Sequence, residues 1–342
     1  KNVVYPQHPL RRHGYEGRGN DAGEAMQSRR DDLWAPAAVL SAAVLIASCQ
    51  PESAPSVDAA TPSTREVANG FLEQMFVEGD MRGAYDRYSS PDLKQHDPSI
   101  ADGRAGLAAQ ITELESQTPA PRDWANVNNM ILVDGDLFAV HRHVFKEPGD
   151  AGRVVVDIWR VENGAIVEHW SVGQAIPAVM AHDNGVACGA GDDYASAKHL
   201  GDTIASPTCG LPDPAAKREE AFAVLDAYAA EFWKGNVEEP ILRWFSTDYR
   251  QHSPVIADGI DGAIAFLQNE YGKGEDQMPK FGPMRTVAEG DYVLRHRLQL
   301  DYGAKSWSAN IDIFRVTGGK ISEHWDLRQD VPEAAKNSNG LW

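Results

Sequence analysis

The chain has 342 residues, of which 42% are hydrophobic and 24% are charged. This balance is that of an ordinary globular protein, and the length suffices for about two domains of roughly 150 residues each. Lysine and arginine total 32 against 50 aspartate and glutamate residues, giving a formal net charge of −18, so nucleic acid is not expected as the main partner.

The amino-terminal segment is predicted to lie outside the folded protein. Residues 34–48 form an apolar run of fifteen residues, too short for a helix that spans a bilayer, which needs about 20. With two arginines before this run, residues 26–48 have the basic start, apolar centre and small-residue end of a signal peptide. We therefore interpret residues 1–25 as an upstream segment foreign to the native protein, which would start at Met26.

The end of this segment resembles the lipobox of bacterial lipoproteins, because Ala47 and Ser48 precede Cys49. In that family the signal is cleaved before the cysteine, which then receives acyl chains. The resemblance implies lipidation of Cys49 and a bacterial cell envelope location, and Gln50 resembles signals for the outer membrane, facing the periplasm. A buried or anchoring helix with a chance cysteine is the alternative. Residues 49–63, rich in proline, serine, alanine and threonine, are predicted to form a flexible tether.

The rest of the chain contains one module written twice. Residues 94–103 reappear as residues 250–259, and both copies end in Ile-Ala-Asp-Gly. Residues 157–164 reappear as residues 312–319, and each copy of this motif is followed by Glu-His-Trp. Equivalent residues stay 155 or 156 positions apart, which is too regular for chance. The chain is therefore predicted to be a tandem repeat.

Each copy is predicted to begin with helices and to end in strands. We expect domain 1 at residues 64–186, a linker at 187–214 and domain 2 at 215–342. In both copies, apolar residues at helical spacing precede alternating stretches that are joined by Asn-Gly or Gly-Gly turns. The predicted fold class is α+β, with helices followed by a four-stranded antiparallel meander. The strands are expected at residues 130–133, 137–145, 153–161 and 165–172, and at 285–288, 292–300, 306–316 and 320–328.

The linker region carries the other two cysteines, Cys188 and Cys209, 21 positions apart. An oxidising envelope location would allow them to form a disulfide. Two free thiols are the alternative, because a disulfide depends on geometry that the spacing does not give. No cysteine belongs to a CxxC pair or to a zinc-type spacing with histidine, so no metal site is expected.

Four motifs of the second copy carry a family resemblance: residues 249–259, 312–316, 323–326 and 339–342. They resemble SnoaL-like proteins, the polyketide-cyclase branch of the nuclear transport factor 2-like superfamily, which also includes ketosteroid isomerases and limonene-epoxide hydrolases. The resemblance implies two tandem cone-shaped α+β barrels, in each of which helices pack on a curved antiparallel sheet around an apolar pocket. It also implies a pocket carboxylate that removes a proton alpha to a carbonyl, without a metal or organic cofactor.

The expected catalytic residues lie on the strands of domain 2. Alternation along residues 320–328 puts His324 and Asp326 on one face. By the resemblance, Asp326 stands where the cyclases keep their acid, and an apolar pocket would raise its pKa as a general base requires. Asp312, on one face with Phe314, is the expected second polar group. A strand-start carboxylate bonded to backbone or to an arginine is the alternative for Asp312.

Histidines and aromatic residues supply the remaining candidates. His296 lies on an otherwise leucine-rich strand face, and we assign it to the pocket, with a satisfied core residue as the alternative. His252, Trp244 and Phe314 are expected to bind substrate, although His252 could instead hold the adjacent loop by hydrogen bonds. The equivalents in domain 1 are Asp157, His169, His141 and His96.

Domain 1 is predicted to be degenerate, because Ser171 stands where domain 2 has Asp326, and a serine cannot replace a carboxylate as base. It would complete an intramolecular pseudo-dimer, as homodimers in this superfamily often do. His141 and His143 project from one strand face and could bind a metal with His169, but we prefer chance adjacency as the interpretation.

Two functions remain open. One is a cofactor-independent enzyme of lyase or isomerase type, acting by proton abstraction on a small apolar carbonyl compound in the pocket of domain 2, as aldol-cyclases and isomerases do. The other is a non-catalytic lipoprotein that binds a ligand or another envelope protein. Envelope attachment favours the second, and the retained acids and histidines favour the first. The sequence lacks a GxSxG motif and a phosphate-binding glycine loop, which disfavours nucleophilic and nucleotide chemistry.

Overall fold

The computed structural model describes residues 61–200, 203–271, 280–301 and 306–342. The expected upstream segment, signal peptide and Cys49 lie outside these residues, as does most of the predicted tether. The described residues all belong to one compact unit. None of the helices within the described ranges is long and apolar enough to cross a membrane. We call residues 61–186 the first half and residues 215–342 the second half.

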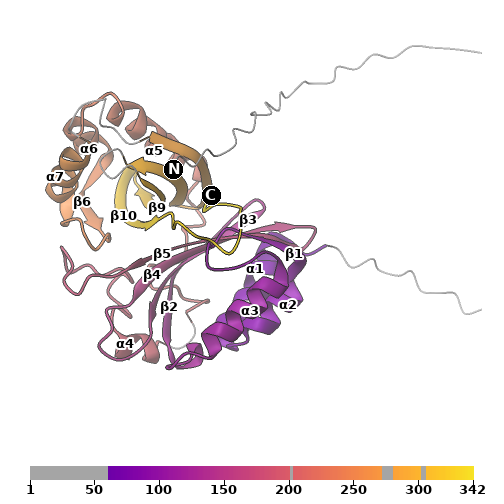
Figure 1. Cartoon of the computed structure of the whole chain (residues 1–342). Coiled ribbons are helices and arrows are strands. Elements are labelled where there is room, and N and C mark those ends of the chain that lie inside the picture. The colour runs from indigo at the N-terminus through magenta and orange to yellow at the C-terminus, as the bar shows by residue number, and fades with distance from the viewer. Residues whose placement is uncertain (1–60, 201–202, 272–279, 302–305) are drawn as a thin grey trace, which may run out of the picture. The chain divides into compact units, whose positions relative to one another are not determined.

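The first half folds as helices followed by a sheet, and its helices lie together beside the strands (Figure 1). Ser63 starts the first helix with a capping box: its hydroxyl accepts from the Glu66 amide, and the Glu66 carboxylate accepts from the Ser63 amide. The helices are α1 (Thr64–Leu72), continued by a π-helical turn (Glu73–Val77), α2 (Met81–Tyr88) and α3 (Gly103–Glu115), followed by a 3₁₀ turn (Pro121–Asp123). The strands are β1 (Ser89–Gln95), β2 (Ala125–Asp134), β3 (Leu137–Phe145), β4 (Arg153–Glu162) and β5 (Ala165–Ala175).

The second half repeats this order. Glu219 and Glu220 lie in the first turn of its first helix, where carboxylates favour the positive end of the helix dipole. The helices are α5 (Arg218–Phe232), α6 (Glu238–Trp244) and α7 (Gly259–Tyr271). The strands are β6 (Phe245–Gln251), β7 (Lys280–Glu289), β8 (Tyr292–Asp301), β9 (Ser306–Thr317) and β10 (Lys320–Asp330).

The two sheets have the same strand order, β1-β5-β4-β3-β2 and β6-β10-β9-β8-β7. The predicted antiparallel meander is present in each half. The prediction missed the fifth strand, since β1 and β6 each add to the sheet in parallel with the last strand of the meander. Both missed strands are short and half-exposed, and β1 contains Pro91, so neither shows the alternation that identifies a strand. The α+β fold class is confirmed.

Each sheet is buried on both faces. One face packs against the helices of its own half, as Phe71 does against Phe138 and Trp159 in the first half. The other face contributes to a core cluster shared by the two halves, which includes Ile158 from β4 and Ile313 from β9. In the central strands of each sheet, such as β4 and β9, the two faces therefore differ in what covers them.

The two halves also exchange equivalent hydrogen bonds through repeated glutamines. The Gly173 amide donates to Gln329 Oε1 at 2.8 Å, and the Arg328 amide donates to Gln174 Oε1, also at 2.8 Å. The two glutamines are 155 positions apart, like the other repeated residues. Each half thus presents the same side chain to the same position of the other.

The segments after β5 and β10 make a second pair of equivalent contacts. His96 Nδ1 lies 2.8 Å from the Gly340 carbonyl oxygen, and His252 Nδ1 lies 2.7 Å from that of Gly185. Each segment therefore reaches the loop that follows the short parallel strand of the other half.

The linker is not featureless. It contains helix α4 (Tyr194–His199), which the sequence analysis did not predict. Cys188 and Cys209 are joined in a disulfide, so of the two alternatives the structure has the bonded form. The Cys209 amide donates to the Asn129 carbonyl at 3.0 Å, which fixes the far end of the linker beside β2.

Candidate active site

A cavity of about 410 Å³ lies in the second half, between α5, α7 and the strands β8 to β10. This volume lies within the roughly 300–1,000 Å³ of small-molecule sites. Most of its wall is apolar or aromatic, and its polar groups gather on the strands. The wall includes Leu225, Tyr228, Phe232, Tyr271, Ile311 and Phe314, and the polar strand residues include Arg295, Arg297, Asp312, His324 and Asp326.

Two of these carboxylates face each other across neighbouring strands. Asp312 on β9 is the direct partner of Asp326 on β10 in the antiparallel register. Like charges in directly opposed positions are destabilising by about 0.2–1 kcal/mol. A pairing that weakens the fold in this way is what a functional site, rather than a structural one, would retain.

The surroundings of the two carboxylates push their pKa values apart. Burial raises the pKa of Asp326, the charge of Asp312 adds to this, and His324 and Arg297 only partly oppose it. Burial also acts to raise the pKa of Asp312, but Arg297 and His324 outweigh it, and the pKa ends below the usual value of 3.8. Two neighbouring acids with opposite shifts are the arrangement expected of one fixed charge and one proton acceptor.

Asp312 ends a hydrogen-bonded chain that runs across the cavity floor. Gln251 Oε1 lies 3.2 Å from His324 Nδ1, and His324 Nε2 lies 3.4 Å from Asp312 Oδ1. The other oxygen of Asp312 is 3.0 Å from Arg297 Nη2. Gln251 Oε1 also accepts the amides of the next two residues, which identifies it as the oxygen of that side chain. His324 Nδ1 therefore donates, and the ring is held in one orientation beside Asp326.

Two tyrosines supply neutral hydroxyl groups to the cavity. Burial raises the pKa of Tyr228 and raises that of Tyr271 to about 12, and the charge of Asp312 contributes to both shifts. Both phenols therefore stay protonated near neutral pH. Each can donate a hydrogen bond to an oxygen atom that gains negative charge in the cavity.

The same residues are a weak site for a metal ion. Asp312, His324 and Asp326 each offer a ligand atom, and these atoms lie within 4.8 Å of one another. However, both oxygens of Asp312 are already paired, one with Arg297 and one with the His324 ring. A cation would have to displace a guanidinium held at 3.0 Å, so the donor set suits a bound cation poorly.

The first half has an equivalent cavity of about 730 Å³. Its polar chain is the same: Gln95 Oε1 lies 2.8 Å from His169 Nδ1, and His169 Nε2 lies 3.2 Å from Asp157 Oδ1. Arg142 Nε lies 2.8 Å from the other oxygen of Asp157. The partner of Asp157 across the strands is Ser171, so this cavity lacks the second carboxylate.

The structure places six of the predicted site residues in the cavities. Their catalytic and binding roles stay predictions, because position alone does not test them. Phe314 stacks on the His324 ring, with ring centres 4.8 Å apart, and so helps to orient it. The six are Asp326, Asp312, His324 and Phe314 in the second half, and Asp157 and His169 in the first.

The assignment of His296 to the cavity is wrong. It projects from the opposite face of β8, is 1% exposed, and has its Nδ1 3.0 Å from Arg285 Nη1. Burial and Arg285 lower its pKa to about 3, so the ring is neutral. The physical reason is that the apolar face of β8 belongs to the shared core, whereas the face with Arg295 and Arg297 lines the cavity.

His141 of the first half, the counterpart of His296, lies outside the cavity for the same reason. It is 2% exposed, and its Nδ1 accepts a hydrogen bond from the side-chain amide of Asn129 at 2.9 Å. His169 lines the cavity from the other face of the sheet. His141 and His169 therefore lie on opposite faces of the sheet, and the possible ligand trio of His141, His143 and His169 is not assembled.

His252 and Trp244 do not line the second cavity either, so their expected contact with substrate is wrong. His252 is 1% exposed and stacks on Trp325 at 4.4 Å, with Glu323 on its Nε2. Its side chain instead contacts the Gly185 carbonyl of the first half and Glu323 of β10. His96 is held likewise against Trp170. Trp244 packs in the helical core at the end of α6, because the chain turns there into β6.

Four residues of the site are not predicted from the sequence: Arg297, Gln251, Tyr228 and Tyr271. A signal was present for two of them. Arg297 repeats Arg142 of the first copy, directly after a histidine in both, and Gln251 repeats Gln95. Retention of a charged or polar residue in both copies would have indicated them. The tyrosines have no counterpart in the repeated motifs, and only the packing of α5 and α7 brings them to the cavity.

Comparisons with known proteins give one family match and a set of solved structures of low identity. Residues 68–169 match the model of the SnoaL-like domain. Among solved structures, TsrD from Streptomyces laurentii is 20% identical, covers 33% of this chain and 90% of its own, and has a TM-score of 0.27. An NTF2-like protein from Burkholderia xenovorans LB400 is 16% identical, with coverages of 33% and 92% and a TM-score of 0.27. An NTF2-like protein of unknown function from Mesorhizobium loti is 14% identical, with coverages of 34% and 97% and a TM-score of 0.29.

No curated protein matches the chain. At these identities and TM-scores, the solved structures carry no argument about activity. The family match falls on the half that has Ser171, and the second half repeats its strand order and sequence motifs. The resemblance stated from the sequence is thereby supported where the family model matches: residues 68–169 carry a SnoaL-like domain, and the second half repeats the strand order of the first.

Proposed function

We propose that the second half is a cofactor-independent enzyme that abstracts a proton from a small apolar carbonyl compound, as aldol-cyclases and isomerases do. The observation that carries this proposal is the Asp312–Asp326 pair, in which one carboxylate is neutralised by Arg297 and the other has a raised pKa inside an apolar cavity. The first half keeps every other member of the polar chain but lacks this pair.

In the proposed reaction, the Asp326 carboxylate takes a proton from the carbon next to the carbonyl group. Negative charge then builds up on the carbonyl oxygen, and the protonated phenols of Tyr228 and Tyr271 are the donors available to stabilise it. The His324 ring, held by Gln251 and Asp312, keeps its edge fixed beside Asp326. Burial of Asp326 beside the apolar part of the wall raises its pKa, which makes the carboxylate more basic.

Hydrogen–deuterium exchange tests this step without knowledge of the natural substrate. A panel of small apolar ketones and β-dicarbonyl compounds in D₂O would be followed by NMR with and without the full-length protein. We expect faster exchange at the carbon next to the carbonyl of those compounds that fit the cavity. The Asp326→Asn variant should lose the effect and the Ser171→Ala variant should keep it. Equal exchange in the Asp326→Asn protein would remove the proposal.

A ligand-binding protein without catalysis is the second candidate. It is favoured by the cavity of the first half, which is apolar in part and, at about 730 Å³, larger than that of the second half, yet has no second acid. Binding without exchange, measured by calorimetry on compounds that the cavities retain, would support this candidate over the enzyme.

The proposal includes an intramolecular pseudo-dimer of the two halves. The shared core cluster and the reciprocal glutamine contacts support it. If it is correct, the second half expressed alone should associate or aggregate, because it exposes its side of the shared core. A stable monomeric second half would contradict this part.

The proposal also includes anchoring of the protein at the bacterial envelope through a lipidated Cys49. It rests on the sequence pattern alone. Mass spectrometry of membrane fractions should find a chain that starts at Cys49 and carries acyl groups, while an unmodified chain that starts upstream of Cys49 would contradict it.

A further inference from the structure

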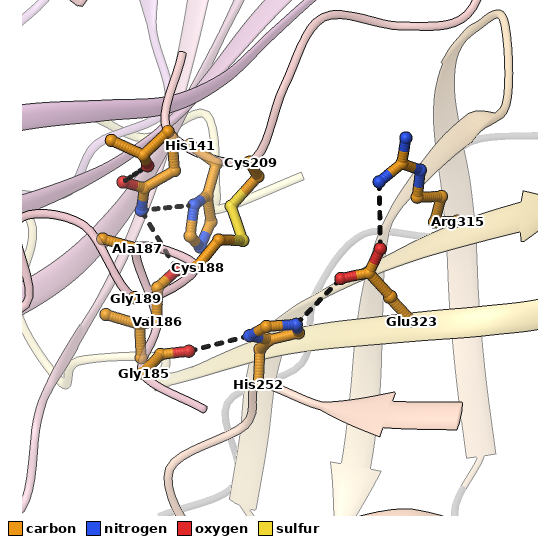
Figure 2. The surroundings of a disulfide bond; sticks show 12 residues. His141, Gly185, Val186, Ala187, Cys188, Gly189, Cys209, His252, Arg315 and Glu323 are labelled. Carbon is orange, nitrogen blue, oxygen red and sulfur yellow. Dashed lines mark hydrogen bonds and ion pairs between the residues drawn. A yellow bond between two sulfur atoms is a disulfide. The ribbon is translucent and has the colours of Figure 1, made fainter. Parts of the chain in front are cut away.

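A cluster of potential metal ligands surrounds the disulfide of the linker. Cys188, His252 and Glu323 each offer a ligand atom, and these atoms lie within 4.8 Å of one another. Cys209 adds a second sulfur, because it is bonded to Cys188. Figure 2 shows His252 between the Gly185 carbonyl and Glu323, beside the two sulfur atoms. None of these residues lines the cavity of the second half.

We propose that reduction of this disulfide converts the cluster into a zinc site with two cysteines, one histidine and one glutamate as ligands. Two thiolates with one imidazole and one carboxylate form a four-coordinate donor set of the kind that zinc accepts. The site would be absent in the oxidised protein, in which both sulfurs are used in the disulfide. The inference is independent of the proposed catalysis.

A dithiol reductant can supply the electrons and hydrogens that reduction of the disulfide needs. The Cys188–Cys209 bond breaks, each sulfur receives a hydrogen from the dithiol, and the dithiol is oxidised to its own disulfide. Binding of Zn²⁺ then releases the two thiol protons, because thiolates are the metal ligands.

The non-sulfur ligands already have the spacing that zinc needs. His252 Nε2 and Glu323 Oε2 are 3.1 Å apart. With zinc–ligand bonds of about 2.0–2.3 Å, atoms on a tetrahedral zinc are about 3.3–3.8 Å apart. The imidazole and carboxylate would therefore separate by only a few tenths of an ångström. The larger movement falls on the sulfurs, which part when the disulfide is reduced.

Each of the two non-sulfur ligands, His252 and Glu323, is also held by a hydrogen bond to a residue outside the cluster. His252 Nδ1 donates to the Gly185 carbonyl at 2.7 Å, which leaves Nε2 as the metal-binding nitrogen, and the ring is 1% exposed. Glu323 Oε1 accepts from Arg315 Nη1 at 3.0 Å, so that Oε2 faces inward. Such outer hydrogen bonds, from histidine to a backbone carbonyl and to a ligating carboxylate, are typical of metal sites.

The first half provides a natural control. There His96 Nε2 lies 2.8 Å from Glu168 Oε1, His96 Nδ1 faces the Gly340 carbonyl, and Arg160 binds the other Glu168 oxygen at 2.9 Å. Among the described residues, no cysteine joins His96 and Glu168 in a group of possible metal ligands. The histidine–glutamate pair therefore has a structural use in both halves, and the linker cysteines are what the second half adds.

The test measures zinc on the full-length protein. One sample stays oxidised; the other is reduced with a dithiol, desalted under argon and given ZnSO₄. After gel filtration, elemental analysis should find about one zinc per reduced chain and none per oxidised chain. With Co²⁺ in place of zinc, the reduced protein should show a sulfur-to-cobalt charge-transfer band. A reduced protein that holds no zinc would overturn the proposal.

Variants identify the ligands. The double variant Cys188→Ser/Cys209→Ser should lose the zinc and the cobalt band; retention of either overturns the site. Glu323→Gln should weaken zinc binding by about tenfold or more, whereas Glu168→Gln should leave it unchanged. Because neither glutamine variant removes the histidine or the backbone contact, both should fold. Equal zinc affinity in these two variants would show that Glu323 is not a ligand and would contradict the four-ligand site.

Discussion

The two halves of this protein carry the same polar chain and differ in the residue that faces its aspartate across the sheet. Gln251, His324, Asp312 and Arg297 have counterparts in Gln95, His169, Asp157 and Arg142, with matching contacts. The second half then places Asp326 opposite Asp312, where the first half has Ser171. Because the glutamine–histidine–aspartate–arginine chain is present in both halves, we infer that it orients the histidine ring in each, and that the second acid is what the proposed base chemistry adds.

The largest effect is expected when the second acid, Asp326, is removed. Asp326→Asn should lower the rate of proton exchange by about 10²–10⁴-fold, the usual contribution of a general base. Ser171→Ala, at the matching position of the first half, should leave the rate unchanged. NMR exchange rates on the same ketone panel would measure both.

The stability of the Asp326→Asn protein gives a second test of the same position. Since the pKa of Asp326 is higher in the folded chain than its usual value, ionisation of this group costs stability as the pH rises through the folded pKa. The amide should therefore leave the melting temperature at pH 7 unchanged or higher. A clear decrease would mean that the carboxylate is stabilising, contrary to our account.

The pH dependence of the exchange rate should also reflect the raised pKa of Asp326. Only ionised Asp326 can accept a proton, so the rate should increase about tenfold per pH unit below its pKa and level off above it. The inflection should lie above 3.8, the usual value for an aspartate, because burial raises this pKa. A rate already constant from pH 4 upward would contradict the assignment of the base.

Loss of the arginine should affect stability alike in both halves but activity in only one. Arg297→Gln and Arg142→Gln each leave a buried aspartate without its cation, and we expect each to cost about 2–3 kcal/mol of unfolding free energy. Arg297 also lowers the pKa of Asp326. Only Arg297→Gln should therefore shift the pH–rate profile, to higher pH. Denaturant titrations and rate profiles would separate the two effects.

The smallest expected effect concerns the segments that cross between the halves. The side-chain amide of Asn184 donates to the backbone carbonyl of Gln251 at 2.9 Å, and the side-chain amide of Asn339 donates to the backbone carbonyl of Gln95 at 2.7 Å. Asn184→Ala and Asn339→Ala should each cost about 1 kcal/mol. Hydrogen exchange should increase in the loop after β6 for the first variant and in the loop after β1 for the second. An identical pattern in both variants would deny that each segment holds the loop of the other half.

Much of the architecture followed from the repeat and from alternation. The doubled motifs predicted two α+β copies, and the alternation along residues 320–328 put His324 and Asp326 on one face, as the structure has them. Alternation assigns residues to faces but not faces to surroundings. For β8 the leucine-rich face was taken for the pocket, and it is instead the side that packs in the shared core, which removes His296 from the site.

The remaining misses have related physical causes. The parallel strand β1 is short, half-exposed and contains Pro91, so no local pattern marks it. Tyr228 and Tyr271 reach the cavity from helices that the sequence places far from the strands, and only tertiary packing brings them there. The ligand cluster around the disulfide joins residues that are 64 and 71 positions apart, which no spacing motif describes.

The central claim is that the cavity of the second half holds a pair of aspartates whose pKa values are shifted in opposite directions. Carboxyl ¹³C NMR titration of the full-length protein, with Asp326→Asn and Asp312→Asn for assignment, measures this directly. We expect the Asp326 signal to titrate at a higher pH than an ordinary aspartate and the Asp312 signal at a lower pH. Two ordinary titrations, or the opposite order, would contradict the account.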